Sequence, residues 1–141
     1  MLDVFYFAKK QVLAQDIVQL GEEKGYQCVL TPSETDADSF YLDIQFGGEI
    51  LRQKRVGNDI LTYPDNDHWF WWNCDNLSDW EADEASQIVD FQPATGFQIA
   101  FHIQSLATLA YFLQCVLNTY GGIVCGINNE IYTSKTIQDI I

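Results

Sequence analysis

Residues 96–118, GFQIAFHIQSLATLAYFLQCVLN, decide the fold because a strand pattern runs directly into a helix pattern. From Phe97 to Ile103, large apolar residues alternate with polar or small ones, which predicts a strand with one buried face. From Ser105 onward, apolar residues recur every three or four positions, which predicts a helix over 105–118. Ser105 is placed to act as the N-cap of that helix. The segment therefore predicts an amphipathic strand followed by the main core helix.

The N-terminal third supplies a second helix between strands. Residues 2–7 and 26–30 have the Val, Phe and Tyr content of strands, and the apolar residues between them recur at helical spacing. This pattern predicts a helix over 9–24. Residues 39–46 then alternate between apolar and polar side chains, which is typical of an antiparallel sheet with one wet face.

Turn residues predict two hairpins. Gly47 and Gly48 follow the strand over 39–46, so residues 49–56, which hold three of the seven Lys and Arg residues, are expected to pair with it. Toward the C-terminus, residues 123–132 have the pattern of a second hairpin, and residues 134–141 that of a short terminal helix.

These elements predict one α+β domain over residues 1–141. Its length and its 48% hydrophobic content fit a single core. We expect a mostly antiparallel sheet of about five to seven strands. It packs against two main helices, over 9–24 and 105–118, and a short C-terminal helix completes the domain.

Residues 64–90 have the most unusual composition in the chain. They contain all four tryptophans and many acidic residues, and no Lys or Arg occurs from Val56 to Ser134. These carboxylates have no local cation to pair with, so we expect them to face water or a partner, and tryptophans beside a charged rim are typical of protein interfaces. The residues expected to bind the partner are Asp65, Asp67, Trp69, Asp75, Asp79, Trp80, Glu81, Asp83 and Glu84.

The run from His68 to Trp72 shows no alternation. It is either a strand buried on both faces or a partly exposed aromatic patch. Trp71 and Trp72, taken individually, are expected in the core.

The formal net charge of −13 comes from 20 acidic residues against 7 basic ones. The negative electrostatic field of so acidic a protein speeds association with basic partners and repels nucleic acid and anionic lipid. Direct binding of DNA or RNA is not expected, because it depends on Lys and Arg that neutralise phosphates. No apolar stretch is long enough to cross a bilayer, so no membrane partner is expected either.

Metal and catalytic motifs fail on their spacing. Asp79, Glu81 and Asp83 match the first three acidic positions of a calcium loop, but Glu84 stands where that loop needs glycine. Neither His68 nor any other histidine or cysteine has a recognised zinc spacing, and no nucleophile or phosphate-loop signature is present. We therefore expect no cofactor, no metal and no enzymatic activity.

The interpretation of the four cysteines depends on the compartment, because two disulfides would be plausible only if the protein is not cytoplasmic. Cys28, Cys74, Cys115 and Cys125 are widely spaced and form no CxxC motif, so they are expected to be small buried hydrophobes. The N-terminus lacks the charge order of a secretory signal. A cytoplasmic location is expected.

The C-terminal third resembles a known class of protein. The helix over 105–118, the sequence Tyr120-Gly121-Gly122-Ile123-Val124, the sequence Glu130-Ile131-Tyr132-Thr133 and the terminal helix are similar to the ends of some small bacterial immunity proteins. These belong to contact-dependent growth inhibition and related polymorphic-toxin systems. The resemblance covers about a quarter of the chain and implies a cytoplasmic protein that binds and neutralises one cognate toxin domain.

The acidic composition suggests how such a protein would work. Nuclease-type toxin domains carry a basic cleft, and the carboxylates of this chain would occupy the positions of phosphates. Two alternatives stay open. One is a DNA mimic that inhibits a DNA-handling protein, and the other is a carbohydrate-active or metal-dependent enzyme that uses the Trp and Asp residues.

Overall fold

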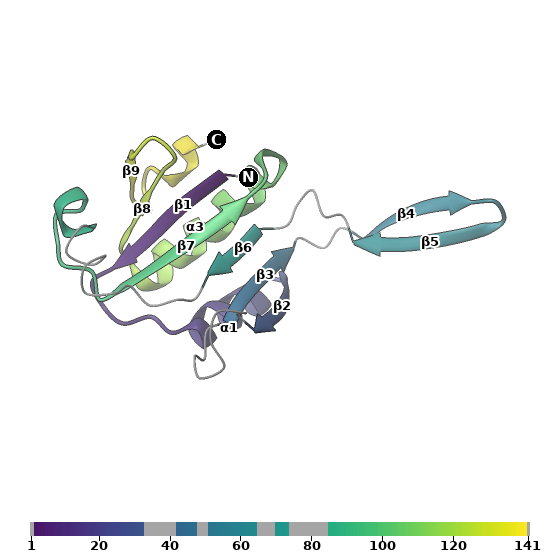
Figure 1. Cartoon of the computed structure of the whole chain (residues 1–141), viewed down its shortest axis with the longest axis horizontal. Helices are drawn as coiled ribbons and strands as arrows, with labels where there is room; N and C mark the ends of the chain where they lie inside the picture. Colours follow the sequence, from purple (N-terminus) through teal and green to yellow (C-terminus); the bar gives the residue numbers. More distant parts are fainter. Residues whose placement is uncertain (1, 33–41, 48–50, 65–69, 74–84, 141) are drawn as a thin grey trace.

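A seven-stranded antiparallel sheet organises the chain (Figure 1). The computed structural model describes residues 2–32, 42–47, 51–64, 70–73 and 85–140. The strands are β1 (Leu2–Ala8), β2 (Gln27–Pro32), β3 (Leu42–Gly47), β4 (Leu51–Val56), β5 (Asp59–Pro64), β6 (Phe70–Asn73), β7 (Thr95–Phe101), β8 (Ile123–Cys125) and β9 (Ile131–Tyr132). The helices are α1 (Ala14–Glu23) and α3 (Leu106–Tyr120), with short 3₁₀ helices η2 (Ile103–Ser105) and η3 (Ile137–Ile140).

The strand order in the sheet is β2-β3-β6-β7-β1-β8-β9. The first strand of the chain therefore lies well inside the sheet, between two strands from the C-terminal half. Leu2 of β1 pairs with Phe101 of β7, and Phe5 pairs with Cys125 of β8. The link from β1 through α1 to β2 carries the chain to the far edge of the same sheet.

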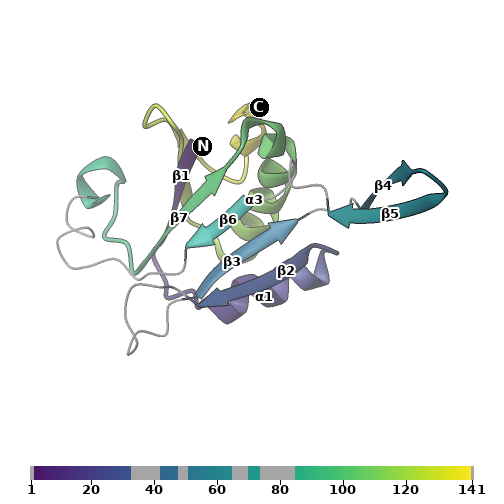
Figure 2. The same cartoon turned by 45° about the vertical axis from the view of Figure 1, so that its right-hand side comes forward.

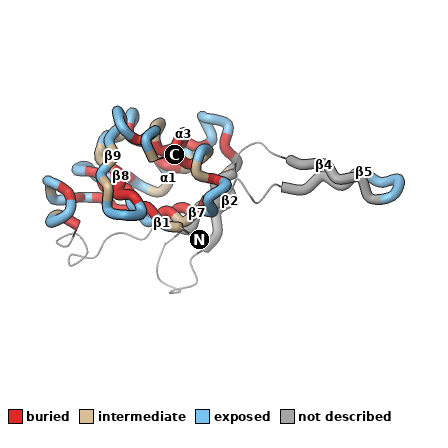
Figure 3. The backbone as a smooth tube through the Cα atoms, turned by 90° about the horizontal axis from the view of Figure 1, so that it is seen from above, coloured by how far each residue is buried: buried red, intermediate tan, exposed pale blue. Residues whose placement is uncertain are grey.

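The domain has two layers, with α1 and α3 on one face of the sheet (Figures 2 and 3). One face of each central strand and the inner side of α3 form the main core, because alternate strand residues point to the same face. Its largest fully buried side chains are Trp72, Tyr6, Phe70, Phe101, Phe112, Ile17, Ile99, Leu109, Leu113 and Ile137. The predicted α+β class and the antiparallel sheet are confirmed.

The strand and helix predicted from residues 96–118 are both present, with shifted boundaries. Phe97, Ile99 and Phe101 are buried in β7 as expected, but the strand ends there and Ile103 is 60% exposed in η2. The Ser105 hydroxyl makes no cap hydrogen bond to α3. Instead, the Ser105 N–H donates to the His102 carbonyl at 2.8 Å, so a 3₁₀ turn leads into the helix.

The first helix begins later than the predicted residue 9. A tertiary hydrogen bond holds the preceding residues in a loop: the Val12 N–H donates to Thr95 Oγ1 at 2.8 Å, and the Thr95 hydroxyl donates to the Lys10 carbonyl at 3.0 Å. The helix can start only beyond this loop. Its first turn is closed by Asp16, whose Oδ2 accepts the Leu13 N–H at 2.9 Å.

The predicted hairpin between residues 39–46 and 49–56 is wrong. In the sheet, β3 lies between β2 and β6, and β4 pairs with β5 instead. Gly57 has a φ of +64°, which lets a tight turn at Gly57 and Asn58 bring β4 and β5 together at little entropic cost. The resulting β4–β5 hairpin projects away from the sheet (Figure 1).

The C-terminal hairpin and final helix agree with the prediction. β8 and β9 pair around a turn in which Asn129 has a φ of +64°, a conformation that asparagine tolerates well. The final helix is the short η3. Thr133 Oγ1 accepts the Lys135 N–H at 3.3 Å, so Thr133 caps the turn that leads into η3.

The buried Tyr6 side chain predicts that the free energy of unfolding falls at alkaline pH. Tyr6 is fully buried and its hydroxyl donates to the Gly121 carbonyl at 2.7 Å. Burial, with a further contribution from Tyr120, raises the pKa of Tyr6 well above its usual range, whereas an unfolded tyrosine ionises near pH ~10. The folded state keeps a proton that the unfolded state loses, so this stabilisation is complete below pH ~10 and decreases as the pH rises further.

Urea denaturation between pH 8 and pH 11 measures this effect. We expect the free energy of unfolding to fall above pH ~10, and Tyr6→Phe to make the slope shallower by up to about 1.4 kcal/mol per pH unit. Parallel curves for wild type and Tyr6→Phe would contradict the expected role of Tyr6.

Candidate functional site

The nine residues predicted to bind a partner lie outside the described residues. Asp65, Asp67 and Trp69 precede β6, and Asp75, Asp79, Trp80, Glu81, Asp83 and Glu84 follow it. The strand β6 lies between these two groups in the sequence, and it is the part of residues 65–84 that the structure describes. β6 pairs with β3 on one side and with β7 on the other.

The tryptophan run of β6 is divided between the two faces of the sheet. Phe70 and Trp72 are fully buried on the helix-covered face, where the Trp72 ring lies 5.7 Å from the ring of Phe112 in α3. Trp71 and Asn73 are half-buried on the opposite face. The expectation of a core position is confirmed for Trp72, whereas Trp71 belongs to a second surface.

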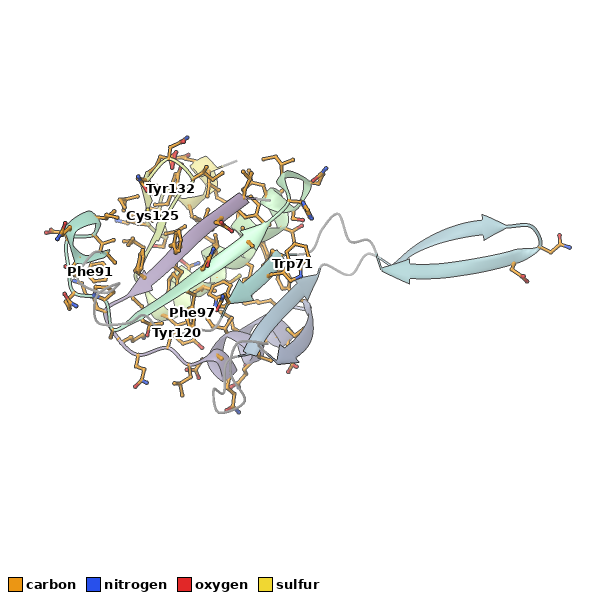
Figure 4. The ribbon with its side chains drawn as sticks, viewed as in Figure 1. Trp71, Phe91, Phe97, Tyr120, Cys125 and Tyr132 are labelled. Atoms are coloured by element: carbon orange, nitrogen blue, oxygen red, sulfur yellow. The ribbon has the colours of Figure 1, made fainter. Side chains whose placement is uncertain are left out.

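This second surface, which we call the open face, carries Trp71, Asn73, Gln98 and Ala100. The strand register places Trp71 beside Ala100 and Asn73 beside Gln98, and the four residues line a pocket of about 180 Å³. The small Ala100 side chain leaves room next to the indole, and Figure 4 labels Trp71 on β6. His102 lies edge-on to Trp71, with ring centroids 5.5 Å apart. This surface combines an apolar indole with the two neighbouring amide side chains of Asn73 and Gln98, which can donate and accept hydrogen bonds.

Another part of the same face is covered. Phe7 and Cys125 are buried there against Ala85 and Val89, which belong to a helical turn over residues 85–88 and the bend that follows it. Phe7 and Cys125 lie in the neighbouring strands β1 and β8. The residues on either side of segment 74–84 are thus Asn73, on the open face, and Ala85, which packs over that face.

A basic pocket, which sequence reasoning did not identify, lies at the end of β1. It is an open pocket of about 520 Å³, which we call the lysine pocket, and it is lined by Lys9, Lys10, Asp90, Phe91, Tyr120, Gly121, Gly122 and Ile123. These residues come from three segments that are remote in sequence. No local signal in the sequence relates them to one another.

Two of the described cysteines, Cys28 and Cys125, are poorly suited to nucleophilic chemistry. Cys28, Cys115 and Cys125 are free thiols. Burial, together with the nearby Glu22, raises the pKa of Cys28 to about 11, and burial with Glu130 raises that of Cys125. A thiol with a raised pKa holds its proton at neutral pH and is a poor nucleophile.

The described residues contain no cluster of three or more His, Cys, Asp or Glu side chains that could hold a metal ion. In the same part of the chain, no helix has the length and apolar character needed to cross a membrane. The strongest surface features are therefore the open face around Trp71 and the lysine pocket.

No family model matches the chain, and no curated protein or solved structure is significantly similar to it.

Proposed function

We propose that this chain is an immunity protein that binds and neutralises a cognate toxin domain, and that this domain is basic and of the nuclease type. The observation that carries the proposal is the position of Trp71. It is a half-buried indole on the open face, in the strand that joins the two acidic segments 65–69 and 74–84. An aromatic anchor beside a strongly acidic rim is the composition of a binding hot spot for a basic partner.

The chain's charge supports a partner of opposite sign. A net charge of −13 steers a basic domain toward the protein and speeds its association. The binding surface we propose combines the open face with the predicted partner-binding residues. Trp69 and Trp80 would act with Trp71 as apolar anchors, and Asp79, Glu81, Asp83 and Glu84 would meet the basic cleft. This function requires no catalytic residue or cofactor, and it places the protein in the cytoplasm.

Co-purification tests the function directly. The tagged chain is expressed together with the adjacent reading frame of its genome, and retained proteins are identified at moderate salt. We expect a single basic toxin-like domain that is released as the salt concentration rises. Recovery of a DNA-handling protein that DNA displaces would instead indicate a DNA mimic, and recovery of no partner would contradict the proposal.

Charge reversal tests the surface. We expect the quadruple substitution of Asp79, Glu81, Asp83 and Glu84 by lysine to slow association with the recovered domain by about tenfold or more at low salt, because steering depends on this local charge. Surface plasmon resonance gives the rate constants. Trp71→Ala should mainly speed dissociation, because it removes an apolar anchor.

A matched control separates local from overall charge. Lysine substitution of the exposed residues Glu22, Glu23, Asp59 and Asp139 also takes the net charge from −13 to −5. This control should slow association much less than the first set. Unchanged affinity in the Asp79 to Glu84 variant would show that the partner binds elsewhere.

A further inference from the structure

The lysine pocket unites three distant parts of the chain at one end of the sheet. Lys9 and Lys10 follow β1, Asp90 and Phe91 follow the helical turn over 85–88, and residues 120–123 lead from α3 into β8. Its volume of about 520 Å³ lies within the range of small-molecule sites, roughly 300–1,000 Å³. Figure 4 labels Phe91 and Tyr120, which supply its aromatic walls.

Both lysine ammonium groups are positioned by aromatic rings. The Lys9 Nζ lies 5.3 Å from the centroid of the Phe91 ring, and the Lys10 Nζ lies 5.4 Å from that of Tyr120. A cation over a ring face is attracted by the ring's negative quadrupole. Each ammonium group has three N–H donors, so a contact with a ring leaves donors that can bind an anion.

The backbone on both sides of the pocket is held by buried side chains. On the lysine side, the buried Thr95 hydroxyl accepts the Val12 N–H and donates to the Lys10 carbonyl. On the opposite side, the buried Tyr6 hydroxyl donates to the Gly121 carbonyl. The walls are therefore formed before any ligand arrives, which lowers the entropic cost of binding.

The pocket is a local exception to the charge of the protein. Its lining carries two cations and one carboxylate, whereas the chain as a whole has a net charge of −13. An anion is repelled by the negative charge of the protein as a whole, so the ammonium groups of Lys9 and Lys10 make this pocket a favourable place for it. Asp90 weakens this attraction but does not cancel it, because the lining has two cations against one carboxylate.

We propose that the lysine pocket binds a small organic dianion, a phosphate monoester or a dicarboxylate, whose apolar body packs between Phe91 and Tyr120. The Lys9 and Lys10 ammonium groups bind the anionic group. The volume exceeds what a bare phosphate ion would fill, so the organic body contributes to affinity. This inference does not depend on the proposed function, because it uses different residues and a different kind of partner.

An NMR titration of the full chain tests the proposal. The probes are phenyl phosphate, phthalate and inorganic phosphate, each added to ¹⁵N-labelled protein at constant ionic strength. We expect saturable shifts at Lys9, Lys10 and residues 120–123, with a dissociation constant of about 1 mM or lower for a ring-bearing dianion. Comparing phenyl phosphate with phthalate identifies the preferred anionic group, and inorganic phosphate should bind more weakly than either.

Two double variants with equal charge make the test specific. Lys9→Gln/Lys10→Gln and Lys24→Gln/Lys135→Gln both change the net charge from −13 to −15, and all four lysines are exposed. The first should weaken binding by about tenfold or more, and the second by less than about twofold. Lys9→Arg/Lys10→Arg should keep most of the affinity. Absence of saturable shifts, or equal weakening by the two Gln pairs, would overturn the proposal.

Discussion

Replacing Gly122 with alanine is expected to lower the free energy of unfolding by about 4 kcal/mol, close to the largest effects of single substitutions. Gly122 has a φ of +89°, which is unfavourable for any residue with a side chain. A Cβ at this position would also overlap the Phe7 carbonyl oxygen and lie 3.2 Å from the Ala8 Cα. The clash is with backbone, so β1 itself would have to move away from the start of β8.

Gly121→Ala is the matched control. Gly121 also has a positive φ, +73°, but a Cβ added there meets nothing within 4 Å. Its replacement should therefore cost backbone strain alone, about 1–3 kcal/mol. Urea denaturation followed by tryptophan fluorescence measures both variants. Equal losses at the two positions would show that contact with β1 does not determine the requirement for glycine at Gly122.

Replacing Phe112 with alanine is expected to cost about 3–5 kcal/mol, the usual range for a fully buried phenylalanine. Phe112 has no exposed surface, and its ring joins α3 to the sheet. Its centroid lies 5.1 Å from that of Tyr26, 5.5 Å from Phe70 and 5.7 Å from Trp72. Truncation leaves a cavity among these three rings, and their rigid neighbours cannot close it fully.

The preceding residue provides the comparison. Tyr111 belongs to the same helix and is 58% exposed, and its ring stacks on Tyr26 at 6.5 Å. Tyr111→Ala should cost about 1 kcal/mol or less, because surface positions contribute little to stability. Circular dichroism during urea unfolding distinguishes the two variants. Similar losses at the two positions would contradict the role of the ring cluster around Phe112.

The parts of the fold that the sequence predicted are those with strong local periodicity. β7 and α3 follow from residues 97–118, since each apolar residue there has one obvious face. The start of α1 could not be predicted in the same way. It depends on Thr95, which is more than eighty positions away along the chain and holds the backbone of Lys10 and Val12.

Strand pairing was the least predictable property. Residues 51–56 have a strand composition that would suit pairing with residues 39–46 or with residues 59–64. The turn at Gly57 brings them against β5. The acidic-aromatic stretch poses the same difficulty. Trp71 and Trp72 are adjacent and chemically identical, and they lie on opposite faces because successive strand residues alternate between the faces of a sheet. Which of the two is buried depends on the register of β6 between β3 and β7. The lysine pocket combines three remote segments, so it emerges only from the tertiary structure.

The central position of β1 has a consequence for synthesis of the protein. Leu2 is translated long before its partner Phe101, and Phe5 long before its partner Cys125. The strand β1 must therefore wait, with Val4 and Tyr6 unburied, until β7 and β8 have been translated. Such non-local pairing slows folding and exposes the nascent chain to aggregation and chaperones. β1 consequently gains both of its neighbours in the sheet only after residue 125 has been translated.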